Sequence, residues 1–214
     1  MPDRPNILWL TYEDTSPQFV SCYGMTPVVT TPAMDALAED GVRFDHFYAG
    51  APVCSASRTG LVTGCPIEAT GHGHHRSAYP LPAEIRGFPW YLQQAGYYTT
   101  NNAKTDYNLV DERVFIDATW NESSPTAHWR NRPEGQPFFS VFNYADSHQS
   151  RTMTKPYRWY EENVLAELPE DEIVQPDEID VPPFYRDDPD MRRHLVRVYN
   201  SLRLCDRRIR ERLD

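Results

Sequence analysis

The chain has 214 residues, of which 40% are hydrophobic and 13% aromatic, a composition that can bury a core and argues against overall disorder. The formal net charge of −10 argues against nonspecific binding to nucleic acid, although a few local cations can still hold a small anion. No apolar run approaches the roughly 18 residues that a membrane-spanning helix needs.

Apolar runs and helix signals alternate through the first part of the chain. Residues 6–11 are almost all apolar, which predicts a strand buried on both faces. Residues 31–41 combine a capping threonine, a proline and a closing glycine, which together predict a helix. The apolar alternation over residues 42–48 predicts a second strand, and a helix is then expected to begin near Ala56 or Ser57.

A further helix and two strands are expected before residue 150. Residues 88–96 predict a helix that closes on glycine, followed by a strand over residues 97–100. Residues 137–144 predict another strand. Strands that alternate with helices in this way indicate an α/β fold with a mainly parallel sheet.

The last third of the chain changes in composition. Proline and acidic residues dominate residues 151–190, so we expect an excursion over the surface rather than a packed element. In residues 191–214 apolar side chains recur at steps of four and three, which predicts an amphipathic helix. Its arginines form either a solvated helix face or a stripe that binds phosphate or heparin. We treat residues 1–214 as one domain with its α/β core at residues 5–150.

Polar side chains follow the ends of three predicted strands. Glu13 and Asp14 come after the first strand, Lys104 and Asp106 after a later one, and His148 after the last. In open α/β sheets ligands bind at the carboxyl ends of the strands, so these side chains are expected to converge. Adjacent carboxylates either form an ordinary polar turn or share a hard divalent cation.

The most specific motif begins at Cys54, where residues 54–64 read CSASRTGLVTG. A lone cysteine is usually a buried small hydrophobic residue, and a thiolate nucleophile is the other general interpretation. This stretch, however, resembles the sulfatase signature, in which a cysteine followed by x-Pro/Ala-Ser-Arg is oxidised after translation to formylglycine.

The resemblance covers most of the chain but only the amino-terminal portion of a sulfatase. It implies the alkaline-phosphatase-like fold, with a mixed, mainly parallel sheet flanked by helices. Family members supply further metal ligands from a later Asp-Asn-Gly or Asp-His-Gly motif, and no such motif follows His148. The chain is therefore expected to be truncated at its C-terminus.

The resemblance also implies catalytic roles. Cys54, as hydrated formylglycine, is expected to be the nucleophile, and Arg58 steadies it. Lys104 is expected to neutralise sulfate oxygens, and His148 to protonate the leaving group. At the position of Asp106 the family usually has histidine.

Metal and substrate contacts are implied in the same way. Glu13, Asp14 and the converted Cys54 are expected to bind Ca²⁺, with Mg²⁺ as the alternative ion. The stretch Gly71-His72-Gly73-His74-His75-Arg76 resembles one that borders the substrate pocket in a branch of the family, so His74, His75 and Asp106 are expected to contact substrate.

The implied activity is sulfuric ester hydrolysis of a sulfated small molecule or carbohydrate, with glycosaminoglycans as one class. A formylglycine-generating enzyme is the expected partner, and neither nucleic acid nor a membrane span is expected. Two alternatives stay open: a phosphodiesterase or phosphonate hydrolase of the same superfamily, and an inactive fragment. The sequence shows no signal peptide, so the expected location is the cytoplasm, or the periplasm or the outside of the cell if a leader has been removed.

Overall fold

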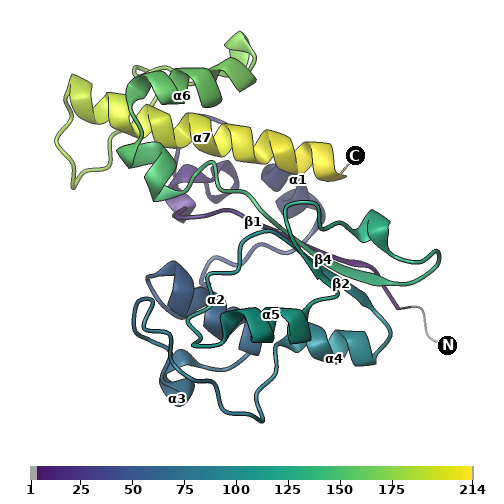
Figure 1. Cartoon of the computed structure of the whole chain (residues 1–214). Helices are drawn as coiled ribbons and strands as arrows, with labels where there is room; N and C mark the ends of the chain where they lie inside the picture. The colour runs from purple at the N-terminus through teal and green to yellow at the C-terminus, as the bar shows by residue number, and fades with distance from the viewer. Residues whose placement is uncertain (1–3, 214) are drawn as a thin grey trace. The chain divides into compact units, whose positions relative to one another are not determined.

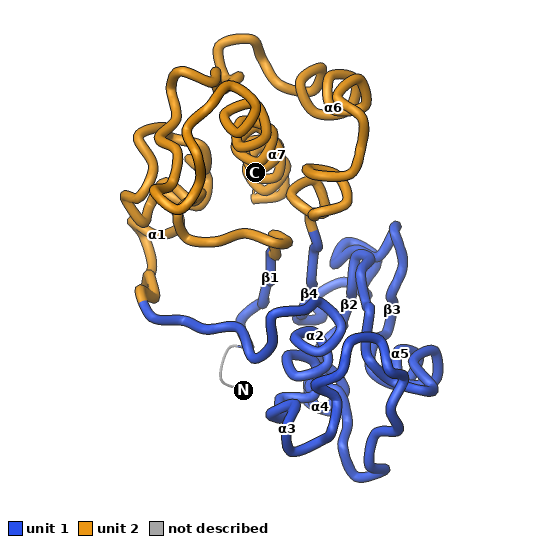
Figure 2. Tube along the Cα trace, turned by 90° about the vertical axis from the view of Figure 1, so that its left-hand side faces the viewer, with its two compact units in different colours: residues 1–10, 46–143 blue, residues 11–45, 144–214 orange. Residues whose placement is uncertain are grey.

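The computed structural model describes residues 4–213 and divides the chain into two compact units. The first unit comprises residues 1–10 and 46–143, and the second comprises residues 11–45 and 144–214 (Figure 2). Each unit has its own buried apolar clusters. No helix in the described range has the length and apolar character needed to cross a membrane.

A four-stranded sheet in the order β1-β4-β2-β3 organises the first unit. The strands are β1 (Ile7–Thr11), β2 (Tyr98–Asn102), β3 (Glu122–Ser123) and β4 (Phe138–Asn143). Strand β2 pairs in parallel with both β3 and β4, and Tyr98 lies opposite Phe138. The carboxyl ends of β2 and β4 therefore lie side by side, so Asn102 and Asn143 are at the same edge of the sheet.

Helices α2, α4 and α5 pack together against β2 and β4 (Figure 1). The helices of this unit are α2 (Cys54–Thr63), α3 (Ile67–Thr70), α4 (Phe88–Gln94), α5 (Glu112–Thr119) and the 3₁₀ turn η3 (Trp129–Asn131). The core centres on aromatic rings, with Trp120 stacked on Phe139 at a centroid distance of 5.8 Å. Val62 of α2 joins this cluster, so the core holds the helix that begins with Cys54.

The second unit is built around the long helix α7 (Pro189–Leu213). Its other helices are α1 (Pro32–Asp40), α6 (Tyr157–Asn163), the π-helical turn η4 (Ser150–Thr154), and the 3₁₀ turns η1 (Pro17–Phe19), η2 (Ser21–Tyr23), η5 (Leu165–Glu167) and η6 (Glu170–Glu172). One apolar cluster gathers Phe19, Ile179 and Leu202, and another gathers Tyr160 and Leu204. Because the two clusters lie on different faces of α7, this helix is buried over more than one stripe.

Most predicted elements are present within one or two residues of their expected bounds. The helix expected over residues 31–41 is α1, and that over residues 88–96 is α4. The strand expected over residues 97–100 is β2, and β4 occupies most of residues 137–144. The amphipathic helix expected over residues 191–214 is α7, although its last predicted residue lies outside the described range.

Two strand predictions are wrong in part or whole. Residues 42–48 form no strand in the described structure, and Val42 and Phe47 are 78% and 76% exposed. Alternating apolar side chains make a strand only when a neighbouring strand supplies backbone partners, and none pairs with this segment among residues 4–213. Strand β1 is half-buried rather than buried on both faces because it is the edge strand of the sheet.

The expectation for residues 151–190 is only partly right. Most of the segment is exposed, as expected of a surface excursion, but it also folds into α6 and several helical turns, and Tyr160, Val164 and Ile179 are each at most 2% exposed. These buried residues pack in clusters with residues of α7. Composition alone therefore did not reveal that a few separate apolar residues of this segment are buried by packing with α7.

Candidate functional site

Cys54 is the first residue of α2 and is half-buried. Val53 has an extended backbone, and its carbonyl accepts the N–H of Ser57 at 3.0 Å, so the helix begins at Cys54 rather than near Ala56. The first turn of a helix directs N–H groups and the positive end of its dipole toward that terminus. An anionic group beside Cys54 would therefore be stabilised.

The other residues of the motif hold this helix in place through burial and hydrogen bonds. Ala56 and Thr59 are fully buried, and the Thr59 hydroxyl donates to the Ser55 carbonyl at 2.7 Å and accepts the Asn108 N–H at 2.8 Å. Gly64 ends the helix with φ of 66°, a left-handed conformation that glycine adopts without a Cβ penalty. The signature thus encodes helix packing as well as the position of Cys54.

Arg58 follows Cys54 by one helical turn and points to the carboxyl ends of the neighbouring strands. Its Nη1 donates to the Asn143 side-chain oxygen at 2.8 Å and to the Lys104 carbonyl at 3.5 Å. Asn143 ends β4, and Lys104 lies two residues beyond the end of β2. The structure therefore brings Arg58 and the backbone of Lys104 together.

Two asparagines complete this network. The Asn143 side-chain nitrogen donates to the Asn101 side-chain oxygen and to the Asn102 carbonyl, both at 3.1 Å. Asn101 in turn donates to the Lys104 carbonyl at 3.2 Å. None of these asparagines was among the predicted site residues, although their place at strand ends was a usable signal.

The loop at residues 71–78 carries the predicted substrate contacts. His74 and His75 are exposed, and His75 Nε2 accepts a hydrogen bond from Arg76 Nη1. Arg76 also forms a two-pronged pair with Asp106, with Nε and Nη2 donating to the two carboxylate oxygens at 3.1 Å and 2.9 Å. The hydrogen bonds and charge of Asp106 raise the pKa of Arg76.

In the second unit, Glu13 and Asp14 meet His148. The His148 Nε2 lies 4.0 Å from Glu13 Oε2 and 4.0 Å from Asp14 Oδ2. His148 Nδ1 accepts the Ser150 backbone N–H at 3.2 Å, so the neutral ring carries its hydrogen on Nε2. Glu13 is buried, whereas Asp14 is exposed and accepts the Gln149 N–H at 2.7 Å.

Carboxylate oxygens are the ligand type that a hard divalent cation prefers, but these two residues supply too few ligands for a complete site. Ca²⁺ takes about six to eight oxygen ligands, and Glu13 and Asp14 supply only part of such a set. Within residues 4–213 no group of three or more His, Cys, Asp and Glu side chains is arranged to hold a metal ion. Cys54, the third predicted ligand, belongs to the first unit, whereas both carboxylates belong to the second.

Asp146 shows that a polar residue after a strand can serve the fold instead. Its carboxylate is buried and accepts hydrogen bonds from Arg151, at 2.7 Å, and from Arg208. Two guanidinium groups therefore neutralise it, and Arg208 ties the turn after β4 to α7. This pairing anchors the segment that leads to His148.

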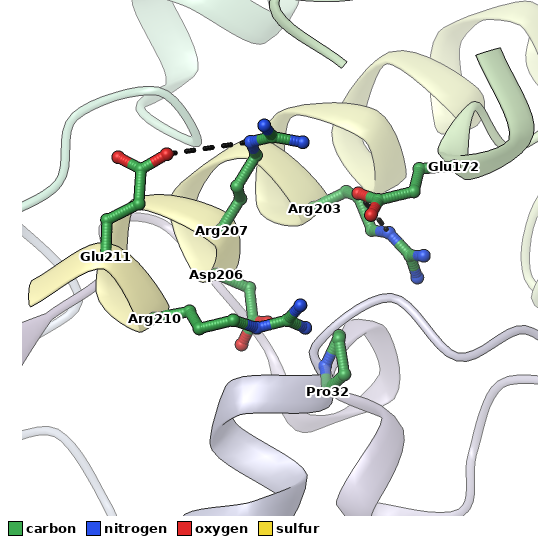
Figure 3. Close-up of a pocket in the computed structure, with 7 residues that line it drawn as sticks. All are labelled: Pro32, Glu172, Arg203, Asp206, Arg207, Arg210 and Glu211. Carbon is green, nitrogen blue, oxygen red and sulfur yellow. Dashed lines mark hydrogen bonds and ion pairs between the residues drawn. The ribbon is translucent and has the colours of Figure 1, made fainter. Parts of the chain in front are cut away.

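A cavity of about 190 Å³ lies between α1 and the arginines of α7 (Figure 3). Its charged lining consists of three arginines and three acidic residues: Arg203, Arg207, Arg210, Glu172, Asp206 and Glu211. Arg203 pairs with Glu172 at 3.4 Å and Arg207 with Glu211 at 3.6 Å. The formal charge of the lining is thus zero, which favours the ion-paired helix face over a stripe that binds phosphate or heparin.

The structure thus gathers the predicted residues in two groups. Cys54, Arg58, Lys104, His75 and Asp106 lie in the first unit, in the network around α2 and the strand ends. Glu13, Asp14 and His148 lie together in the second unit. The His74 side chain has no hydrogen bond among those described, and the backbone carbonyl of His74 accepts one from Asn108.

Comparison with known sequences gives a consistent result. A family model described as Sulfatase matches residues 5–210. The ulvan-active sulfatase of Formosa agariphila is 32% identical over 244 residues, an alignment that covers 98% of this chain and 40% of that protein. The chain therefore spans less than half the length of this relative.

Solved structures share the fold. A 2-O GAG sulfatase matches with a TM-score of 0.67 and 16% identity, covering 97% of this chain and 53% of that one. The phosphonate monoester hydrolase of Agrobacterium radiobacter matches with a TM-score of 0.59 and 17% identity, covering 96% and 58%. The predicted α/β fold, with a parallel sheet flanked by helices, is confirmed.

Proposed function

Because the chain belongs to the sulfatase family, we propose that it acts as a sulfuric ester hydrolase on a sulfated carbohydrate. The observation that carries this proposal is the position of Cys54 at the start of α2, with Arg58 one turn later and held against the strand ends. Relatives named for ulvan and for GAG sulfates support a sulfated polysaccharide as the substrate class.

Conversion of Cys54 is the chemical premise of this proposal. A formylglycine-generating enzyme, with molecular oxygen as the oxidant, would oxidise the Cβ of Cys54 to an aldehyde, with cleavage of the Cβ–S bond and loss of the sulfur. The hydrate of this aldehyde would supply the nucleophile that attacks the sulfur of the sulfate ester. Half-burial at the helix start leaves the Cys54 side chain accessible while the buried Ser55 and Ala56 hold its backbone in place. The positive end of the α2 dipole would favour the negative charge of a sulfate ester there.

Arg58 and Lys104 supply cations for the sulfate oxygens. Arg58 has five N–H donors, and Asn143 and the Lys104 carbonyl orient its guanidinium through Nη1. A side chain held in this way needs little reorganisation when charge develops in the transition state. The Lys104 ammonium would act as a second, more mobile point charge.

His148 is proposed as the proton donor to the leaving oxygen. Its Nδ1 is occupied by Ser150, at 2.7 Å from the hydroxyl and 3.2 Å from the backbone nitrogen. Nε2 is therefore the nitrogen that carries the transferable proton. The Nε2 atom lies 4.0 Å from a carboxylate oxygen of Glu13 and 4.0 Å from one of Asp14.

The carboxylates of Glu13 and Asp14 are also the proposed residues that would hold a divalent cation, Ca²⁺ or Mg²⁺, with Cys54 as a further ligand. Such an ion, when bound, supplies positive charge to the sulfate oxygens. Each carboxylate has an oxygen 4.0 Å from His148 Nε2, and this proximity supports a shared role.

Co-expression with a formylglycine-generating enzyme tests the premise. We expect the peptide that contains Cys54 to show the mass of the aldehyde, whereas a peptide that contains Cys65 keeps its thiol. The matured protein should release sulfate from an aryl sulfate, and Cys54→Ala should not. Because a phosphonate hydrolase shares the fold, a phosphonate monoester and a phosphate diester are assayed beside the sulfate.

Three outcomes would contradict the proposal. Preference for the phosphorus substrates would favour the phosphonate hydrolase or phosphodiesterase alternative. Absence of conversion at Cys54 would favour an inactive protein. Conversion without turnover of any of these esters would show that the Cys54 environment alone does not make a hydrolase.

A further inference from the structure

Arg76 and Asp106 form a paired unit whose remaining donors and acceptors are unused. The guanidinium has five N–H groups, of which Nε and one on Nη2 bond to Asp106 and one on Nη1 bonds to His75. Two N–H groups are left over. Each Asp106 oxygen accepts one bond from Arg76 and keeps one acceptor site.

This pair lies beside the reactive end of α2. The backbone N–H of Arg76 donates to the hydroxyl of Ser55, the residue after Cys54, at 3.3 Å. A molecule held at Cys54 would therefore have Arg76 within reach.

The loop that carries Arg76 is held rigidly by a buried side chain. Asn108 is 2% exposed, and its side-chain nitrogen donates to the carbonyls of His72, at 3.1 Å, and His74. Its side-chain oxygen accepts the Ala78 N–H at 3.0 Å. The Asn108 backbone is in turn bonded to Thr59 of α2, so the loop and the nucleophile helix share one anchor.

Both partners adopt left-handed backbone conformations, with φ of 48° for Arg76 and 51° for Asp106. Such conformations cost side chains other than glycine about 1 kcal/mol or more and persist where the surroundings enforce them. Here the anchored loop and the two-pronged ion pair are the surroundings that do so. The pair is exposed by 54% and 20% for its two side chains, so it can be reached from solvent.

The charge of the pair indicates what it would bind. Arg76 and Asp106 neutralise each other, so the unit offers no net positive charge to a sulfate group. It does offer adjacent donors and acceptors, which match a hydroxyl group because a hydroxyl both donates and accepts. Neighbouring hydroxyls on a sugar ring present this chemistry in pairs.

We propose that Arg76 and Asp106 form a specificity site for the hydroxyl groups of the sugar that carries the sulfate ester. This inference rests on the proposed function, because it takes Cys54 as the site of the sulfate. Arg76 and Asp106 would select carbohydrate sulfates over aryl sulfates, which lack such hydroxyls.

Binding measurements on the full chain with Cys54→Ser test the proposal without turnover. The probes are glucose 6-sulfate, the same sulfate with its ring hydroxyls O-methylated, and inorganic sulfate. Arg76→Gln and Asp106→Asn are each expected to weaken binding of glucose 6-sulfate about tenfold, the loss of one or two hydrogen bonds. The O-methylated sugar and inorganic sulfate should be affected less than twofold.

Arg113→Gln is the matched control, because Arg113 is an exposed, ion-paired arginine of the same unit. Arg76→Lys keeps the charge but loses the planar fork, so it should also weaken glucose 6-sulfate binding. Thermal unfolding of each variant checks that the protein still folds. If Arg76→Gln does not fold, Arg76→Lys replaces it in the binding measurements.

Equal losses for all three probes would overturn the proposal and make the pair a support of the loop. Unchanged binding in both variants would overturn it too, as would failure of the parent chain to bind glucose 6-sulfate. Failure of the proposed function is detected separately, by the conversion of Cys54 and the hydrolysis of an aryl sulfate.

Discussion

The hydroxyl group of Ser147 bonds to both backbone groups of Glu13. It donates to the Glu13 carbonyl at 2.6 Å and accepts the Glu13 N–H at 3.2 Å. Both residues are at most 5% exposed, so water does not replace these bonds easily. Together with the bond from the Gln149 N–H to Asp14, this clamp joins the turn after β1 to the turn that carries His148.

Ser147→Ala is expected to lower the free energy of unfolding by about 1 to 3 kcal/mol, because two buried backbone groups lose their partner. It should also weaken Ca²⁺ binding by about tenfold or more, as removal of an orienting partner does at metal sites. Urea denaturation and titration calorimetry measure the two effects. Ser16→Ala, an exposed serine without a capping bond, is the control. Matching results for the two variants would show that the clamp has no such role.

Asn143→Ala is expected to lower the free energy of unfolding by about 1.5 to 3 kcal/mol, the range for hydrogen bonds to charged groups. The substitution removes the acceptor of Arg58 and the donor to Asn101 and Asn102 at once. Urea denaturation followed by circular dichroism measures the change. Asn163→Ala, at an exposed position of α6, should change it by less than about 0.5 kcal/mol. A comparable small change for Asn143→Ala would contradict the role of this network.

Asp206→Asn is expected to destabilise the second unit by about 1 to 3 kcal/mol. The Asp206 carboxylate accepts the first N–H groups of α1, from Ala33 at 2.8 Å and Met34 at 3.0 Å, and the Tyr12 hydroxyl at 3.0 Å. In asparagine one of the two oxygens is replaced by an NH₂ group, which cannot accept a hydrogen bond, so at least one of these donors would lose its partner. Thermal unfolding is the measurement.

Asp190→Asn is the matched control for Asp206→Asn, because Asp190 lies on the same helix with its side chain 83% exposed. Its effect should stay within about 0.5 kcal/mol. If both substitutions cost the same, the Asp206 cap does not stabilise α1.

Stability is expected to fall as the solution becomes alkaline. Burial raises the pKa of Tyr107, Tyr160 and Cys205 to about 12, from 10.0 for tyrosine and 9.0 for cysteine. Because each folded-state pKa lies above the unfolded value, the unfolded state loses its protons first. The stabilisation is complete below about pH 9 and is lost as the pH rises toward about 12.

Urea denaturation at a series of pH values, with tyrosinate absorbance as a second probe, measures this dependence. Tyr107→Phe should show a shallower fall above pH 10, because one ionising group is removed, whereas Tyr91→Phe, at a 54% exposed position, should follow the parent. A flat profile up to pH 12 would contradict the burial of these groups.

Local patterns in the sequence predicted most of the fold. Threonine, proline and glycine marked the ends of α1, and apolar runs marked β2 and β4 because these strands are buried in the sheet. The start of α2 was misjudged by two or three residues, since Val53 makes no side-chain cap that a sequence could reveal. Residues 42–48 carry a strand pattern, but a strand also requires a partner at its side.

The sequence by itself determined the family and most of the order of the elements, and it singled out Cys54 as the predicted nucleophile, because a motif and a hydrophobic period are encoded in neighbouring residues. Only the tertiary structure decided which polar groups meet. Ser147 and Glu13 are 134 residues apart, and Asp206 caps a helix 173 residues away. Arg76 and Asp106 pair across 30 residues, and the buried Asn108 anchors the loop that carries Arg76. No local pattern encodes such contacts, since they depend on how distant segments pack.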